Sequence, residues 1–441
     1  LDWARVARLR SEASTALTEA LGEHPAMARA EQEELGRSII ERLLDGEDAD
    51  TVVRRGQART LAERRQLAEA TFDALFRLGR LQPLLDDPEV ENVMITGFDR
   101  VVVERADGTL VEAEPVADSD EELLDFLSFL AGRADNPRPF SASQPSLHLR
   151  LEDGSRLAAA RDTARPSVVV RRHRVRRVTL ADLVEWGTLS PLMAGFLSAA
   201  VKARRSIVVS GGQGDGKTTL VRALCAEIDP WEVIGTFETD HELFLHEQPE
   251  ERHALVYAWE APTELEGSRQ TAEQALDSFR FRLDRGIVGE VRGAEVQLIV
   301  KLGESGAGSM STIHAAGAQQ AIDKLIACAM EADGQLSRQD AAAKVARTVH
   351  LVVQMACELV RDPDDPSKAR HHRYVAEIAE VLPGQNEAGY TTTMIFKRRP
   401  GRCAVAARHP ARLMERLIGH GFDADGFDAE VRANRQQPRG L

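Results

Sequence analysis

The chain has 441 residues, of which 43 % are hydrophobic and 29 % charged, and its formal net charge is −14. This length predicts two or three domains, and the composition is that of a folded globular protein with no apolar run of membrane-spanning length. The negative charge argues against general adhesion to nucleic acid or anionic lipid. The four scattered cysteines form neither a disulfide framework nor a zinc motif. Because the chain begins at Leu1 without an initiator Met, we expect further residues before it.

Residues 1–79 are predicted to form an N-terminal helical segment. Apolar residues recur there at helical spacing among many Arg and Glu, as in Ile39, Ile40, Leu43 and Leu44.

Residues 80–175 predict a small α+β domain. The runs Val93–Ile95 and Val101–Val103 are strand candidates, and a helix is expected over 121–131. The Asp-Gly pairs at Asp107 and Asp153 are typical of hairpin turns.

Residues 176–400 alternate helix and strand patterns, which predicts an α/β domain with a mainly parallel, helix-covered sheet. A basic run, residues 171–177, precedes it as a linker or interdomain seam. The expected strands are Ile207–Val209, Val233–Phe237, Gly286–Val288, Gly308–Ile313, His350–Met355 and a strand-like stretch at Tyr390–Phe396. Residues 401–441 are predicted to be a C-terminal tail of coil with a short helix at 412–419.

A phosphate-binding P-loop, GGQGDGKT, lies between the first of these strands and a helix-like stretch. Its glycines let successive backbone N–H groups turn toward one anion, and the helix adds free N-terminal amides. Lys217 is expected to reach the β- and γ-phosphates and the Thr218 hydroxyl to hold Mg²⁺. The sequence therefore predicts a nucleoside triphosphate site made by Gly211, Gly212, Gln213, Gly214, Asp215, Gly216, Lys217, Thr218 and Thr219.

Three further motifs follow predicted strands and supply candidate partners for the P-loop. Glu290 follows the strand Gly286–Val288 and is a candidate to orient or deprotonate the attacking water. Glu238 and Glu242 are candidates for the metal shell, with a solvated acidic turn as the alternative. His314 ends a strand of small residues and is either a phosphate sensor or a structural histidine.

These pieces, in this order, resemble the secretion-motor ATPases of type II/type IV secretion and type IV pili, and most of all the CpaF/TadA branch of tight-adherence (Flp) pilus systems. The resemblance spans residues 81–396. It is carried by the P-loop GGQGDGKTT, the acidic box FETDHEL, the Walker B segment GIVGEVRGAE and the histidine box SMSTIHA, with LQPLLDDPEVENVMITGFDRVVVER, SVVVRRH and RYVAEIAEVL around them.

The resemblance implies a RecA-like P-loop domain that binds ATP and Mg²⁺ and hydrolyses ATP. It makes Glu290 the catalytic glutamate, His314 the histidine-box residue and Glu238 and Glu242 the acidic-box carboxylates, with Thr218, Glu238 and Glu290 around the metal. Arg171 or Arg172 stands where the family offers an arginine from the N-terminal domain. The family implies a hexameric ring at the cytoplasmic face of the inner membrane, which drives pilin assembly or retraction through polytopic membrane partners.

The sequence departs from the family pattern at two site positions. Asp215 stands where the family usually has Ser, and Thr239 replaces an Asp of the acidic box, which Asp240 can substitute. A carboxylate near the phosphates repels them unless it points away or pairs with an arginine. These departures predict slow hydrolysis with nucleotide binding preserved.

Two alternatives remain open from the sequence. One is a conjugation-type DNA-translocating ATPase, suggested by the basic run 171–177, although the run lacks interleaved aromatic residues and nucleic acid is not the expected partner. The other is a nucleotide-regulated scaffold with little hydrolysis.

Overall fold

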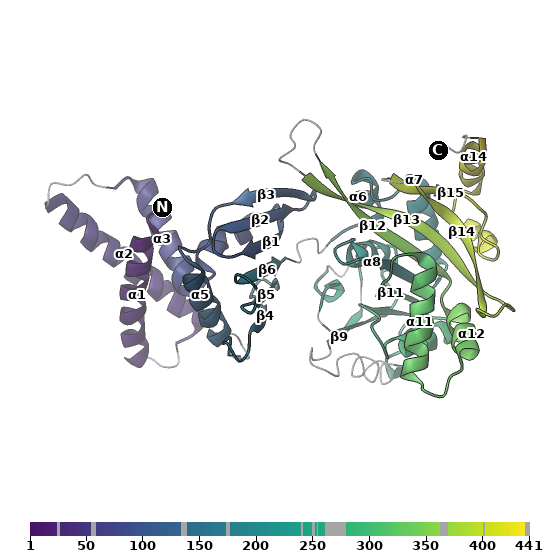
Figure 1. Cartoon of the computed structure of the whole chain (residues 1–441), viewed down its shortest axis with the longest axis horizontal. Coiled ribbons are helices and arrows are strands. Elements are labelled where there is room, and N and C mark those ends of the chain that lie inside the picture. Colours follow the sequence, from purple (N-terminus) through teal and green to yellow (C-terminus); the bar gives the residue numbers. More distant parts are fainter. Residues whose placement is uncertain are drawn as a thin grey trace. The chain divides into compact units, whose positions relative to one another are not determined.

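The computed structural model describes residues 1–23, 27–53, 59–133, 139–172, 177–239, 241–248, 252–253, 255–260, 279–361, 369–399 and 402–436. The chain divides into two compact units, Leu1–Arg174 and Val175–Leu441, which are described one at a time (Figure 1).

The first unit opens with three helices that pack on one another. Leu9, Ile40, Leu44 and Phe72 lie in their shared apolar cluster, so the helical periodicity of the sequence corresponds to a buried face. The helices are α1 (Trp3–Glu23), α2 (Arg29–Val53) and α3 (Leu61–Phe76), followed by the short turns η1 (Gly79–Leu81) and α4 (Gln82–Asp86).

A six-stranded antiparallel sheet and helix α5 (Asp120–Arg133) complete the first unit. The strand order is β4-β5-β6-β1-β2-β3, and the expected turns at Asp107 and Asp153 connect β2 to β3 and β4 to β5. Alternate strand residues face α5: Val93 and Ile95 of β1 share one apolar cluster with Leu127 of α5. The strands are β1 (Val90–Thr96), β2 (Arg100–Arg105), β3 (Thr109–Ala113), β4 (Ser146–Arg150), β5 (Arg156–Ala160) and β6 (Ser167–Arg171).

The second unit is built on a sheet of nine described strands in the order β9-β8-β10-β11-β7-β12-β13-β14-β15. From β9 to β12 the pairings are parallel, and from β12 to β15 they are antiparallel. The strands are β7 (Ile207–Gly211), β8 (Ile234–Glu238), β9 (Val256–Glu260), β10 (Arg285–Val288), β11 (Gly308–His314), β12 (Leu351–Arg361), β13 (Ala369–Pro383), β14 (Tyr390–Arg399) and β15 (Arg402–Ala406). The mainly parallel α/β fold expected from the sequence is confirmed.

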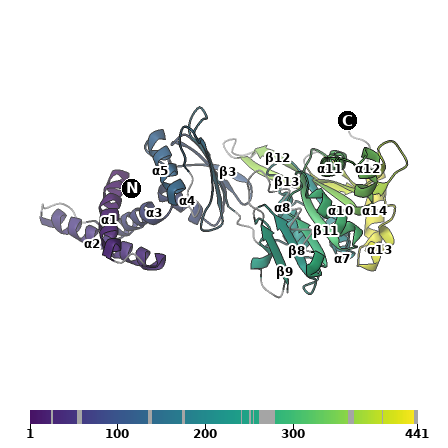
Figure 2. The ribbon, with the colours of Figure 1, turned by 90° about the horizontal axis from the view of Figure 1, so that it is seen from below.

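Helices cover both faces of this sheet (Figures 1 and 2). Strand β7 shows why: Ile207 and Val209 point into one apolar cluster and Val208 into the other, so a continuous apolar run is buried on both sides. The helices and helical turns are α6 (Leu180–Glu185), α7 (Pro191–Lys202), α8 (Lys217–Cys225), η2 (Leu245–Glu247), η3 (Phe279–Phe281), α10 (Val296–Glu304), α11 (Ala318–Ala332), α12 (Arg338–Thr348), α13 (Met414–Gly419) and α14 (Ala424–Gln436).

The end of the chain holds more structure than the expected coil with one helix. Strand β15 pairs with β14, and Phe427 and Val431 of α14 lie in the same apolar cluster as Phe196 of α7. Phe427 and Val431 are four residues apart and therefore share one face of a helix. This spacing is the signal that the sequence prediction missed.

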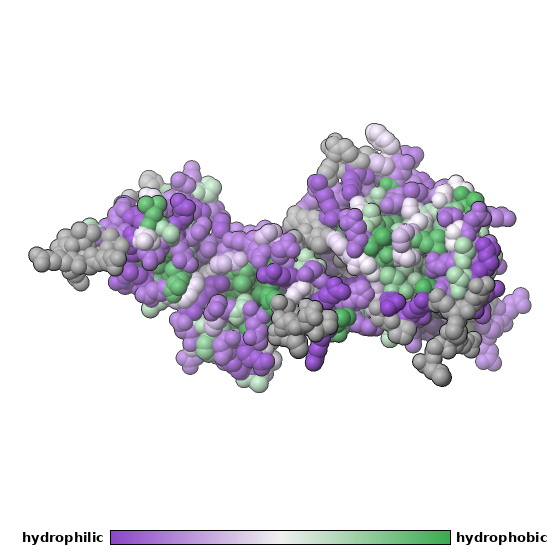
Figure 3. Space-filling view, turned by 90° about the horizontal axis from the view of Figure 1, so that it is seen from above, coloured by the Kyte–Doolittle hydropathy of each residue, from purple (hydrophilic) through white to green (hydrophobic). Residues whose placement is uncertain are grey.

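The face seen in Figure 3 is predominantly hydrophilic in its described residues, with apolar side chains among the polar ones. Large exposed apolar residues include Leu61, Trp186 and Trp231, which lie far apart in the sequence. Within the described part of the chain, no helix is both long enough and apolar enough to cross a bilayer.

Candidate nucleotide-binding and hydrolysis site

The P-loop runs from the end of β7 at Gly211 to the start of α8 at Lys217. Gly214 and Gly216 have φ angles of 79° and 87°, in the left-handed region that glycine adopts without strain. The backbone N–H groups of residues 213–216 donate to no protein acceptor among the described residues. The loop therefore presents the open amides that an anion requires.

Lys217 is connected to Glu290 through His314. The Lys217 Nζ atom lies 3.3 Å from His314 Nδ1 and 2.5 Å from the carbonyl oxygen of Gly212. On the other side of the ring, His314 Nε2 lies 3.0 Å from Glu290 Oε1. Three residues far apart in the sequence thus meet at the carboxyl edge of the parallel strands, where ligands of α/β sheets bind.

These contacts define the tautomer of His314. A lysine ammonium can only donate, so His314 Nδ1 accepts from Lys217, and the ring proton lies on Nε2 and is donated to Glu290. Burial and the nearby Lys217 ammonium lower the pKa of His314 from its ordinary value of 6.5. The lowered pKa favours the neutral imidazole at pH 7.

The Glu290 carboxylate is held on two sides. Its Oε2 atom accepts from Nε and Nη2 of Arg292 at 2.9 and 2.7 Å, while Oε1 faces His314. The strand end that carries it is fixed by Thr312, whose hydroxyl donates to the Gly289 carbonyl oxygen at 2.7 Å. A carboxylate in this position can orient a water molecule or accept its proton.

The acidic turn after β8 places a second carboxylate beside the P-loop. Thr218 Oγ1 donates to Glu242 Oε2 at 3.1 Å. Glu238 is 3 % exposed, and its Oε1 atom accepts from the backbone N–H groups of Glu242 and Leu243 at 2.9 and 3.0 Å. Glu238 thus positions the turn from which Glu242 reaches Thr218.

The residues around Thr218 fit Mg²⁺. Hydroxyl and carboxylate oxygens are the donors that this ion prefers, and it is usually held by one or two such groups together with substrate phosphates. The described residues contain no group of three or more His, Cys, Asp or Glu that could hold a metal ion. Among the described residues, buried Glu238 Oε2 accepts no hydrogen bond, and His241 Nδ1 lies 3.6 Å from it.

Two predicted residues, Arg171 and Arg172, belong to the first unit. Arg171 ends β6, and the Arg172 side chain donates to the carbonyl oxygens of Asp87 and Val90. The role of both residues toward nucleotide stays a prediction. Residues 173–176 of the basic run, and Asp240, lie outside the described residues.

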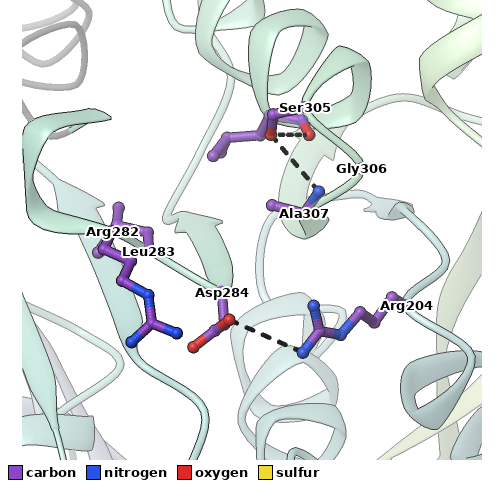
Figure 4. Close-up of a pocket in the computed structure, with 8 residues that line it drawn as sticks. Arg204, Arg282, Leu283, Asp284, Ser305, Gly306 and Ala307 are labelled. Carbon is purple, nitrogen blue, oxygen red and sulfur yellow. Dashed lines mark hydrogen bonds and ion pairs between the residues drawn. The ribbon is translucent and has the colours of Figure 1, made fainter.

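Arg285, the first residue of β10, lies at the opposite, amino end of the parallel strands. Arg285 is 1 % exposed and forms an ion pair with Glu232. A pocket near it is lined by residues that precede β7, β10 and β11, the amino ends of those strands (Figure 4). Its lining is Arg204, Arg282, Leu283, Asp284, Leu302, Ser305, Gly306 and Ala307. The P-loop follows the carboxyl end of β7, so this pocket is not the nucleotide site.

Several residues of the site carried no assigned role in the sequence. Arg292 holds Glu290, and Arg222 donates to the Glu242 carbonyl oxygen at 2.8 Å. Arg373 of β13 donates from Nε to the Gly214 carbonyl oxygen at 2.8 Å. A charged residue next to a motif glutamate was the available signal for Arg292, whereas Arg373 lies 159 positions from its partner and gave none.

Three features define the class of P-loop nucleoside triphosphatases. They are a parallel α/β sheet, a P-loop with open amides at the carboxyl end of one strand, and a carboxylate at the carboxyl end of a strand nearby. Residues 147–412, more than half of the chain, match the family model described as "Type II/IV secretion system protein". The chain belongs to this family and is an ATPase.

Two curated relatives and one solved structure illustrate the similarity. VirB11, a type IV secretion system protein of Brucella suis biovar 1, is 32 % identical over 331 residues, which are 69 % of this chain and 89 % of the relative. The conjugal transfer protein TrbB of Rhizobium radiobacter is 27 % identical over 67 % of this chain and 85 % of its own length. The crystal structure of the VirB11 ATPase of Brucella suis with sulphate is 25 % identical, covers 70 % of this chain and 95 % of that chain, and has a TM-score of 0.35.

Proposed function

We propose that this ATPase is the motor of a type IV secretion machinery of the conjugation type. The observation that carries the proposal is the similarity to VirB11 and TrbB, each matched over most of its own length. The tight-adherence pilus motor expected from the sequence becomes the second candidate. The conjugation-type ATPase, first considered as an alternative, takes its place.

The geometry supports a division of roles at the site. The open amides of residues 213–216 and Lys217 bind the triphosphate, and Thr218 and Glu242 hold Mg²⁺. When bound, Mg²⁺ neutralises charge that develops on the phosphates. Glu290 orients the attacking water. His314 donates a hydrogen bond from Nε2 to the Glu290 carboxylate, and its Nδ1 atom accepts one from Lys217.

We also propose that six copies form a ring at the cytoplasmic face of the inner membrane, where polytopic membrane proteins of the machinery are its partners. The family resemblance supports this assembly. Size measurement of the full chain with and without a non-hydrolysable ATP analogue tests it, and a particle of one chain under both conditions contradicts it.

The second candidate, a CpaF/TadA-type motor for pilin assembly or retraction, is favoured by the segment from Leu81 to Arg105. That segment resembles the tight-adherence branch and runs from the last residue of η1 through α4, β1 and β2.

Transfer experiments separate the two candidates. In the cells that encode the protein, Lys217→Ala should abolish DNA transfer between cells and leave surface pili of the tight-adherence type unchanged. With the purified chain, duplex DNA should raise ATP turnover at 50 mM salt and lose this effect by about 200 mM, because counterion release makes DNA binding steeply salt-dependent. Loss of surface pili with DNA transfer intact, together with indifference to DNA, would favour the pilus motor.

A further inference from the structure

The phosphate-binding loop contains a carboxylate that bonds to the loop itself. Asp215 Oδ2 accepts from the Gly212 backbone N–H at 2.5 Å. The same oxygen lies 3.0 and 3.2 Å from the places where a Cβ on Gly211 or Gly212 would stand. A side chain at either position would crowd the carboxylate, so the two glycines leave it room against the start of the loop.

This bond occupies an amide at the beginning of the loop and leaves the middle open. The N–H groups of residues 213–216 have no protein acceptor among the described residues, so Asp215 does not fill the anion site that they form. A second bond acts on the other side of Gln213, where Arg373 Nε donates to the Gly214 carbonyl oxygen at 2.8 Å. Side chains thus hold one N–H of the turn, that of Gly212, and two carbonyl oxygens, that of Gly214 through Arg373 and that of Gly212 through Lys217.

The two side chains that make these bonds have opposite charges. Asp215 brings a negative charge, which opposes a triphosphate, and Arg373 brings a positive charge, which offsets it. A hydrogen bond between a carboxylate and a backbone N–H is of the stronger, charge-assisted type. A loop already held in shape loses less conformational entropy when a ligand binds.

We propose that Asp215 and Arg373 are positioning residues that hold the empty P-loop in its nucleotide-binding shape. Through its hydrogen bond Asp215 raises nucleotide affinity, and through its charge it lowers affinity by a smaller amount. The proposal deepens the ATPase assignment and rests on it.

The test compares Asp215→Asn with Asp215→Ala in the full chain. Asn keeps an oxygen that can accept from Gly212 and removes the charge, whereas Ala removes both. With Mg²⁺ and ATP that carries a fluorophore on its ribose, the Kd of the Ala variant should exceed that of the Asn variant about tenfold, the size of one net hydrogen bond. The Asn variant should bind about threefold more tightly than the wild type, because a weak repulsion is lost.

Arg373→Ala should weaken binding more than Asp215→Ala, because it removes a hydrogen bond and an attractive charge, whereas Asp215→Ala removes a hydrogen bond and a repulsive charge. Because both bonds hold the same turn, the Kd of the double variant should rise by less than the product of the two single increases in Kd. In steady-state assays of Asp215→Ala the change should fall on KM, with kcat altered less than about twofold.

A matched control is Asp423→Ala. Asp423 Oδ1 accepts from the Gly426 N–H at 2.8 Å just before α14, so this variant removes the same kind of bond and charge elsewhere, and Kd should not change. An Ala variant at 215 that binds as tightly as the Asn variant, or more tightly, would overturn the role of Asp215. An unchanged Kd in Arg373→Ala would overturn the role of Arg373. A wild-type chain that binds no nucleotide would instead refute the ATPase assignment itself.

Discussion

At the residue scale, the site depends on a line of polar contacts from Lys217 through His314 to Glu290. The sequence identified each of these residues, because each follows a strand of apolar or small residues. It could not predict that His314 lies between the other two, since this requires β11 to be the neighbour of both β7 and β10. The direction of the Asp215 side chain could not be predicted from the sequence either, because it depends on the backbone dihedral angles of the loop.

The protonation state of His314 is the first prediction at this scale. Burial and Lys217 lower its pKa, so the neutral form persists below pH 6.5, and the proton that binds on further acidification goes to Nδ1 and removes the acceptor for Lys217. In nucleotide-free protein labelled with ¹⁵N-histidine, the signal absent from His314→Gln should show the Nε2–H tautomer at pH 7 and a titration midpoint below 6.5.

Exposed His420 serves as the internal reference for that titration, with a variant His420→Gln for its assignment. A His314 midpoint above 6.5, or a proton on Nδ1 at pH 7, would contradict the arrangement.

At the element scale, the strands of the second unit were largely predictable. The expected strand Ile207–Val209 lies within β7, Gly286–Val288 within β10 and Gly308–Ile313 within β11, because a continuous apolar or small-residue run between helices is typical of a buried parallel strand. Strand β12 continues beyond the expected end to Arg361, since it pairs with β13 along its length. Long-range pairing of this kind leaves no local signal in the sequence.

Neighbouring strands are also joined by buried polar contacts. The Ser210 hydroxyl of β7 lies 2.6 Å from Gln354 Oε1 of β12, and Gln354 Nε2 lies 3.3 Å from the carbonyl oxygen of Ala315, the residue after His314. Such a network fixes the relative position of the P-loop strand and the histidine strand.

His350, at the start of β12, provides a prediction about stability. Its Nδ1 accepts from the Ser206 N–H at 3.0 Å, and burial lowers the pKa of His350 to about 4. Between pH 6.5 and 4 the unfolded chain therefore binds a proton that the folded chain does not, and stability falls as the pH falls, by about 2 kcal/mol after allowance for solvent screening.

Asn at position 350 keeps an oxygen acceptor for Ser206 and does not titrate. The melting temperature of the second unit should therefore depend less steeply on pH in His350→Asn than in the wild type. Some slope should remain, because burial also lowers the pKa of His253 to about 4. Equal slopes in the two proteins between pH 4 and 6.5 would show that His350 is not buried in its neutral form.

At the scale of the whole molecule, a first unit of helices and an antiparallel sheet is followed along the chain by a second unit with the P-loop ATPase fold. The sequence predicted the class of both. The division into 1–79, 80–175, 176–400 and 401–441 stays a prediction, while the described residues after 401 pack on the core of the second unit. Similarity to VirB11 and TrbB favours a conjugation-type system over the pilus motor expected from the sequence. The motifs alone do not distinguish the two, because all these motors share them.

The most direct measurement is ATP binding and phosphate release on the same samples of wild type, Lys217→Ala and Glu290→Gln, with Glu304→Gln as a control at an exposed carboxylate. Glu290→Gln should bind ATP within about threefold of the wild type and lose at least about a hundredfold in turnover, the contribution expected of a group that accepts a proton from water. Lys217→Ala should lose both binding and turnover, and the control should change neither. Wild-type turnover in Lys217→Ala or in Glu290→Gln would contradict the site.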